Sequence, residues 1–368
     1  MSDFLVSSMG LSGAPRMAVF RAQEQLAIAQ KEVVTGRYAD VGLSLGVSVS
    51  RTISMRGQLS NTEKLISANT AIAQRFETMQ SILETVAATG ENLKSSLIAN
   101  GASDVAMRTN KQGSESAIGQ LIGAMNSSFG SRFLFSGAAA DKPAMQPKVT
   151  EDFASSPAKM AIDKAWNDYL TGLGRQPSEL TGEEMKGFFD DPLTATTDDG
   201  PFAALFDDAH WNQGEVGPPA VTPLWSQASD GKIVNRIGDT ETIQTSRSAN
   251  EGAFRDLMKS YVMLSAFNPE ELGDEARQVL TSRAIQTLDK GLSGLNTIRT
   301  EIGGFEERIK LTNENLDNRK AILEVSVAEM EEVDVYEAST RVTNLRNLLE
   351  TSYAVTARIS RMSILNYL

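Results

Sequence analysis

The sequence has no cysteine and a single histidine among its 368 residues. Without thiols the chain can form neither a disulfide framework nor a thiolate zinc site, and one imidazole removes most histidine-based catalysis and metal binding. Aromatic residues make up only 6% of the chain, a content that suits slender helical packing better than a large globular core. We therefore expect no catalytic, cofactor-binding or metal-binding residues.

Long apolar runs and a signal sequence are also missing. No stretch of about 18 consecutive apolar residues occurs, so no transmembrane helix is expected. Residues 1–15 lack the basic region and the apolar core of a cleavable secretory signal. If the protein leaves the cytoplasm, another export route must carry it.

Basic residues are fewer than acidic ones, which gives a net charge of −12 and a pI near 4.8. Nucleic acids and anionic membrane surfaces both present negative phosphates, which this chain would repel. Neither is expected as a partner.

Proline is absent from residues 295–368, where apolar residues recur at coiled-coil spacing almost to the last position. The pattern predicts a long helix without proline and with two apolar seams, the second displaced by one residue, as expected where a long helix absorbs a small change of register or is divided between two domains. The first seam is Ile302, Phe305, Ile309, Leu316, Leu323, Met330 and Val333, and the second is Leu345, Leu348, Val355, Ile359 and Met362. Because such a helix cannot bury its stripe against itself, it needs a partner helix or another copy of the chain.

The opposite end of the chain offers a partner helix. Val19, Leu26 and Val33 keep the same spacing in a helix predicted to begin at Pro15, and Gly36 is expected to end it. This segment is the natural companion of the C-terminal helix.

The following residues predict further helices separated by short breaks. Apolar residues alternate over 36–52, which predicts a loop or hairpin. Helices are predicted over 53–98 and 105–129, and a short β-prone run over 132–137.

Composition changes sharply between residues 141 and 225, which hold nine of the eleven prolines, all three tryptophans and the only histidine. Proline at that density breaks long helices, so an inserted, separately folded region is the simplest interpretation. Helical periodicity resumes near residue 250.

These patterns predict a mainly α fold, an elongated antiparallel helical bundle or coiled coil built from both chain ends, with an inserted α+β or β-rich middle domain. We expect assembly segments at 1–40 and 335–368, a helical rod at 41–140 and 250–334, and an acidic outer domain at 141–249. The expected assembly interface is Val19, Leu26, Val33, Leu345, Leu348, Val355, Ile359 and Met362. An ordinary helical core would show the same seams, and that alternative stays open.

Acidic clusters and the histidine point only weakly to a chemical site. His210 is expected in a loop, because no second histidine or cysteine can join it. The pairs Asp190-Asp191, Asp198-Asp199 and Asp207-Asp208 lack the spacing and turn glycine of a calcium loop, so we expect solvated surface. The acids Glu331, Glu332, Asp334 and Glu337 are expected on an exposed helix face, and the glycines Gly291, Gly294, Gly303 and Gly304 to permit close helix packing.

Four segments resemble the flagellin superfamily, most closely its hook–filament junction branch, the third hook-associated proteins. The Thr-Gly-Arg step at 35–37 resembles the family's step after the first helix, and residues 126–137 resemble its Asn-containing helix end followed by an aromatic-Leu-Phe-Ser-Gly strand. Residues 334–338 resemble the Asp-x-x-Glu-Ala step that opens the terminal helix, and 352–368 resemble the closing segment of the junction branch.

The resemblance covers about residues 1–140 and 250–368 and has two departures. Ala-Asp-Val-Gly at 39–42 replaces a Ser-Asp-Asp-Pro-like turn, and residues 1–10 lack the Asn-rich opening of flagellins proper. The second departure favours the junction branch.

The resemblance implies a structural subunit that passes unfolded through the flagellar type III export channel and then orders between hook and filament. The implied partners are copies of itself, the hook-associated protein on the hook side, flagellin on the filament side, the export apparatus and an export chaperone. The implied location is the extracellular flagellum. The alternatives are a filament-forming flagellin, a cytoplasmic signalling coiled coil, and an enzyme housed in residues 141–249.

Overall fold

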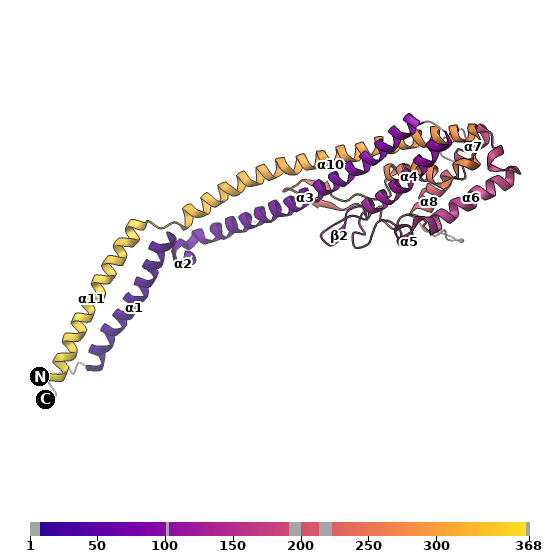
Figure 1. Cartoon of the computed structure of the whole chain (residues 1–368). Coiled ribbons are helices and arrows are strands. Elements are labelled where there is room, and N and C mark those ends of the chain that lie inside the picture. Colours follow the sequence, from indigo (N-terminus) through magenta and orange to yellow (C-terminus); the bar gives the residue numbers. More distant parts are fainter. Residues whose placement is uncertain (1–7, 101–102, 191–199, 213–222, 366–368) are drawn as a thin grey trace. The chain divides into compact units, whose positions relative to one another are not determined.

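A computed structural model describes residues 8–100, 103–190, 200–212 and 223–365 (Figure 1). Most of them are helical, which confirms the mainly α fold class. Their contacts divide the chain into two compact units, Met1–Lys64 with Asn315–Leu368 as the first and Leu65–Glu314 as the second. The domain boundaries expected from the sequence remain predictions.

The first unit is built from both ends of the chain. Helix α1 (Ser8–Thr35) packs along α11 (Val335–Leu365), as Figure 1 shows in indigo and yellow. The unit also contains the beginning of α3 (Val49–Asn100) and the end of α10 (Asp274–Glu331). Pairing of the N-terminal and C-terminal helices is confirmed.

The link between α1 and α3 is helical, so the predicted loop or hairpin over 36–52 is wrong. Gly36 ends α1 with a left-handed φ of 67°, as predicted. Helix α2 (Val41–Leu45) and the 3-10 turn η1 (Gly46–Ser48) then follow. The carboxylate of Asp40 accepts the N–H of Leu43 at 2.9 Å. This N-cap stabilises a helical turn where apolar alternation alone predicted extended backbone.

The C-terminal helix is interrupted, contrary to the prediction from its apolar spacing, whereas the resemblance of residues 334–338 to the step that opens the terminal helix agrees with the break. Helix α10 ends at Glu331 and α11 begins at Val335. Asp334 Oδ1 accepts the backbone N–H of Tyr336 at 2.8 Å and of Glu337 at 3.2 Å. This cap starts a new helix, and the change between the two predicted seams coincides with the break.

In the second unit, α4 (Asp104–Met125) lies between α3 and α9 (Gly252–Ala266) in sequence and packs against α9. Helix α4 ends before the predicted residue 129. The reason is a hairpin, in which β1 (Ser128–Phe129) pairs antiparallel with β2 (Arg132–Phe133). Gly130 in its turn has a φ of 62°, a conformation that glycine adopts without strain.

The middle of the chain consists of short elements. Strands β3 (Val234–Arg236) and β4 (Thr242–Gln244) form an antiparallel pair in which Asn235 opposes Ile243. The helical elements are α5 (Pro147–Glu151), η2 (Phe153–Ser155), α6 (Pro157–Leu173), η3 (Pro177–Glu179), α7 (Gly182–Phe189), η4 (Ala203–Phe206) and α8 (Asp208–Trp211), with η5 (Pro269–Glu271) just before α10. The middle region is therefore small, and its strands are short.

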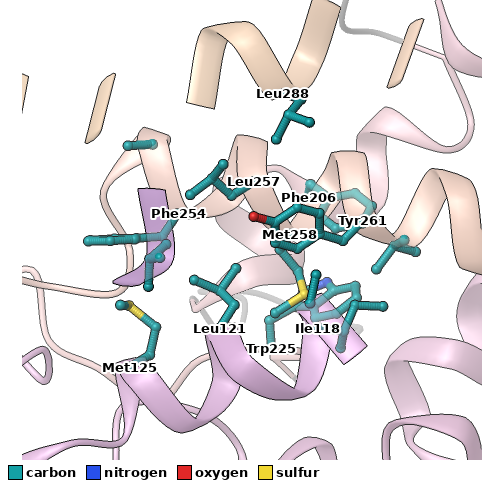
Figure 2. Close-up of a cluster of buried hydrophobic side chains, with 14 of the residues drawn as sticks. Ile118, Leu121, Met125, Phe206, Trp225, Phe254, Leu257, Met258, Tyr261 and Leu288 are labelled. Atoms are coloured by element: carbon teal, nitrogen blue, oxygen red, sulfur yellow. The ribbon is translucent and has the colours of Figure 1, made fainter. Parts of the chain in front are cut away.

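Aromatic side chains of the middle region share a buried core with the helices around them. Trp225 stacks on Phe206 at 4.8 Å and on Trp211 at 5.6 Å between ring centroids. Figure 2 shows Trp225 and Phe206 beside residues of α4 and α9, including Ile118 and Tyr261. All three tryptophans of the chain thus lie where the short elements need a large apolar filling.

Two of the four glycines expected to permit close packing do so. A methyl group on Gly291 of α10 would lie 2.9 Å from the backbone nitrogen of Leu257 in α9, and one on Gly294 would lie 2.9 Å from Cβ of Ala253. In contrast, Gly304 has open space on its side-chain side, and Gly303 meets only the end of Gln80 at 3.8 Å. Close approach of α10 to α9 therefore depends on the first pair.

We expect Gly291→Ala to lower the free energy of unfolding by about 1–3 kcal/mol, because the added methyl group overpacks the α9–α10 contact. Gly304→Ala on the same exposed helix should instead raise it by up to about 1 kcal/mol through helix propensity. Chemical denaturation of the two variants measures both changes, and a stable Gly291→Ala variant would contradict the packing role.

Candidate assembly surface

The contact between α1 and α11 is narrow and lined by small side chains. Ala22 and Ala29 of α1 are buried against α11, which contributes Ala338, Leu345 and Leu349. The three residues of α11 keep heptad spacing. Alanine at these positions lets the two helices approach closely. Each helix thus uses one face to hold the other.

The residues expected to form the assembly interface fall on different faces of this pair. Val19, Leu26 and Val33 are half-buried on α1, and Leu345 is buried. Leu348 and Val355 are about half exposed, at 53% and 47%. The side chains of Ile359 and Met362 lie outside the described residues. The assembly role of these eight residues remains a prediction.

A second apolar face of α1 is uncovered. Phe20 is 65% exposed and Val34 is 85% exposed, and Met17 and Ile28 are also exposed. At 100° per residue these four positions lie on the side of the helix opposite Ala22 and Ala29. On α11, the same geometry places Leu348 and Val355 together on a flank of the α1-facing line. Within the described residues, the terminal helices carry apolar surface that the chain itself does not cover.

A buried carboxylate at the end of α10 binds arginines from α3 and from the segment after α1. Glu331 at the end of α10 is fully buried, and its two oxygens each lie 2.6 Å from a nitrogen of the Arg56 guanidinium in α3. Arg37 lies 3.6 Å away. The bond to Glu331 raises the pKa of Arg56 above its ordinary value. The expectation that Glu331 lies on an exposed face is wrong, because its partners come from other segments. Its neighbours Glu332, Asp334 and Glu337 are exposed, as expected.

A second buried carboxylate, Glu32 of α1, extends this network to α11. Glu32 accepts the N–H of Ala39 at 3.3 Å and a bond from Arg341 at 3.2 Å. Backbone bonds lie between the two carboxylates, where the N–H of Val333 donates to the carbonyl oxygen of Gly36 at 3.0 Å. We call Glu32, Arg37, Arg56, Glu331 and Arg341 the junction network. Sequence reasoning missed it, although the motif at 35–37 contains Arg37 and the carbonyl group of Gly36 that bonds to Val333.

His210 and the described members of the acidic pairs each have a structural partner. His210 lies in α8 and not in a loop, with Nδ1 2.8 Å from Asp207 Oδ1. Asp190 is buried against Arg283, and burial raises the pKa of Asp190, so it is not the solvated surface expected. Asp208 pairs with Arg255. Asp191, Asp198 and Asp199 lie outside the described residues.

Nowhere in the described residues do three or more histidine, cysteine, aspartate or glutamate side chains gather in a way that could hold a metal ion. Their helices also include none with the length and apolar character needed to cross a membrane.

Comparison with known proteins identifies both ends of the chain. The bacterial flagellin N-terminal helical region matches residues 6–140 and the bacterial flagellin C-terminal helical region matches residues 285–368, together more than half of the chain. A solved structure from Vibrio parahaemolyticus, described as a flagellar hook-associated protein, is similar over 77% of this chain and 97% of its own, with 11% identity and a TM-score of 0.49. That likeness is too distant to carry an argument about function. None of the curated proteins matches the chain.

We expect Glu331→Ala to destabilise the junction network, because it leaves Arg56 without its buried partner. Loss of one partner of a buried ion pair costs about 3–5 kcal/mol, and the half-exposed Arg56 places this case at or below the lower end. Amide hydrogen exchange measures it at the N–H groups of Tyr38 and Val333, which bond across the network.

The control is Glu329→Ala, an exposed position in the last turns of the same helix, which should leave exchange at both amides unchanged. Equal exchange in the two variants would show that Glu331 does not hold the network.

Proposed function

The chain belongs to the bacterial flagellin family, and we propose that within this family it is the subunit that joins the hook to the filament. Membership makes the protein an axial structural protein of the flagellum and not an enzyme. It is exported, lies in the extracellular flagellum and assembles with other axial proteins. The cytoplasmic signalling coiled coil and the enzyme in residues 141–249 are therefore set aside.

The uncovered apolar faces of the terminal helices carry the assembly part of the proposal. Phe20 and Val34 on α1, and Leu348 and Val355 on α11, expose apolar side chains that the described chain does not cover. In an axial assembly the same helices of neighbouring subunits would cover them, and burial stabilises by about 25 cal/mol per Å² of apolar surface. This gain offsets the entropy of ordering segments that travel unfolded through the export channel.

The sequence resemblance supports the junction over the filament. Residues 352–368 resemble the closing segment of the junction branch, and residues 1–10 lack the Asn-rich opening of filament subunits. The partners that follow are copies of the chain, the hook-associated protein on the hook side, flagellin on the filament side, the type III export apparatus and an export chaperone. A filament subunit is the alternative, because the same terminal helices would serve it.

Deletion of the gene separates the two. If the protein joins hook to filament, deletion should leave hooks without filaments and release the filament protein as monomer into the medium. Electron microscopy of the cells and analysis of the medium for flagellin give the answer. Filaments that remain attached would overturn the junction role, and loss of all flagellin from the medium would indicate the filament subunit.

The double variant Leu348→Asp and Val355→Asp tests the assembly face. We expect it to abolish motility, because two carboxylates would be buried between subunits without partners. Thermal unfolding of the purified chain should stay within a few degrees of the parent, since both side chains are already about half exposed.

Asn347→Asp adds the same charge at another exposed position of α11 and serves as the control. We expect it to retain motility. A large fall in the unfolding temperature of the double variant would place these two residues in the monomer core instead.

A further inference from the structure

A groove in the first unit combines an uncovered apolar wall with two arginines. It has a volume of about 580 Å³ and is lined by the segment after α1, by α3 and by α10. The lining includes Arg37, Arg56, Leu59, Glu324, Val325 and Val327. Val327 is buried, whereas Val325 is 58% exposed. The groove is therefore open to an apolar side chain from outside the described chain.

The two arginines bring more positive charge to one end of the groove than the chain neutralises there. Arg37 and Arg56 share a single buried carboxylate, Glu331, and their side chains remain 58% and 54% exposed. Glu324, which also lines the groove, lies 3.8 Å from Lys320. Because one carboxylate cannot balance two guanidinium groups, the arginine end of the groove favours a further carboxylate.

The beginning of α11 presents the complementary chemistry. Tyr336 is 83% exposed, so its ring fills no groove of its own chain, and Val335 beside it is about half exposed. Glu332 and Asp334 are exposed and form no ion pair with any described residue. We call these four residues the acidic knob. It offers one aromatic ring and two free carboxylates at the same surface.

We propose that the acidic knob of one copy of this chain binds in the groove of a neighbouring copy. The inference rests on the proposed function, because it needs copies held side by side. The ring of Tyr336 would pack on Leu59 and Val325, within reach of the arginines for a cation–π contact. A carboxylate of the knob would accept hydrogen bonds from the exposed guanidinium groups.

A second copy is the occupant because the chain itself supplies both halves of the contact. Groove and knob are matched in charge, are both partly apolar and both belong to the unit built from the two chain ends. A knob bound in the next copy's groove leaves one knob and one groove free. The contact can therefore repeat from subunit to subunit, as a ring or a helical assembly requires.

The contact would also fix the relative position of two subunits. Apolar faces such as that of Phe20 and Val34 attract a neighbour without direction. A tyrosine with flanking carboxylates fits only where an apolar wall and arginines lie together, and any other placement leaves these charges unpaired. The groove would thus select one arrangement among several that bury similar apolar area.

The absence of cysteine allows a direct test in intact flagella. The variants Tyr336→Cys and Val325→Cys carry different tags and are expressed together, since both positions are exposed enough to accept the change. After mild oxidation we expect a disulfide-linked dimer with one chain of each kind, because the bond forms only if the knob of one copy reaches the groove of another. Electrophoresis without reductant, followed by detection of both tags, measures it.

Flagella built from either cysteine variant alone are the controls, and they should give little dimer. A dimer of Tyr336→Cys alone in the same yield would show that knobs meet one another, and it would overturn the proposal. Absence of the mixed dimer from flagella that keep their filaments would overturn it as well, and would indicate that the knob binds a different axial protein.

The variant Val325→Asp gives a second measurement, because it places a carboxylate where the knob brings its own. We expect about a tenfold or greater loss of the chain from the flagellar fraction, with the shed chain recovered from the medium. The unfolding temperature of the purified chain should stay within a few degrees of the parent, since Val325 is already more than half exposed.

The matched control is Leu311→Asp, at an exposed position several turns earlier in α10, which should incorporate normally. Equal incorporation of the two aspartate variants would overturn the proposal. The mixed dimer is expected whether the chain joins hook to filament or builds the filament. Failure of this inference is therefore distinguishable from failure of the junction role, which the gene deletion tests.

Discussion

The terminal helices carry apolar surface that the described part of the chain does not cover, and this constraint shapes the first unit. A helix with a single apolar stripe is satisfied by one partner, whereas α1 has Ala22 and Ala29 on one side and Phe20 and Val34 on the other. The first side holds α11 through small residues. The second side is exposed in the described chain, and our proposal assigns it to a neighbouring subunit.

The α1–α11 pair has an uncovered face, so contacts within the chain must hold it to α3 and α10. The junction network provides these contacts. Glu331 and Glu32 are buried carboxylates, each bonded to an arginine from another helix. Such pairs add little net stability compared with apolar packing. They do require one arrangement of the helices, because a misplaced arginine leaves a buried charge unpaired. The network therefore fixes which helix ends meet, while apolar contacts supply the stabilisation.

Local signals in the sequence predicted most of the long helices and the end of α1, but they missed α2, the break between α10 and α11 and the end of α4, and they could not identify long-range partners. Gly36 ends α1 in a left-handed conformation that glycine adopts easily, so the identity of this one residue was enough to predict the helix end. The partner of Glu331 is Arg56, 275 residues away, and no periodicity identifies it. Leu345 and Leu348 were both placed on one seam, yet only Leu345 is buried against α1. Leu345 and Leu348 both fit heptad spacing, and which of them is buried depends on the side chains of the opposing helix.

The middle region shows how the chain compensates for slender helices. Its short elements cannot bury a stripe as long helices do, so Trp211, Trp225 and Phe206 supply a large apolar volume in few residues. The helices beside it approach closely where Gly291 and Gly294 remove the side chain. Large aromatic rings fill the middle region, and the two glycines bring α9 and α10 close together. Both features make the second unit compact by itself, without any use of the exposed faces of α1 and α11. The core of the second unit therefore does not depend on the apolar faces that our proposal assigns to assembly.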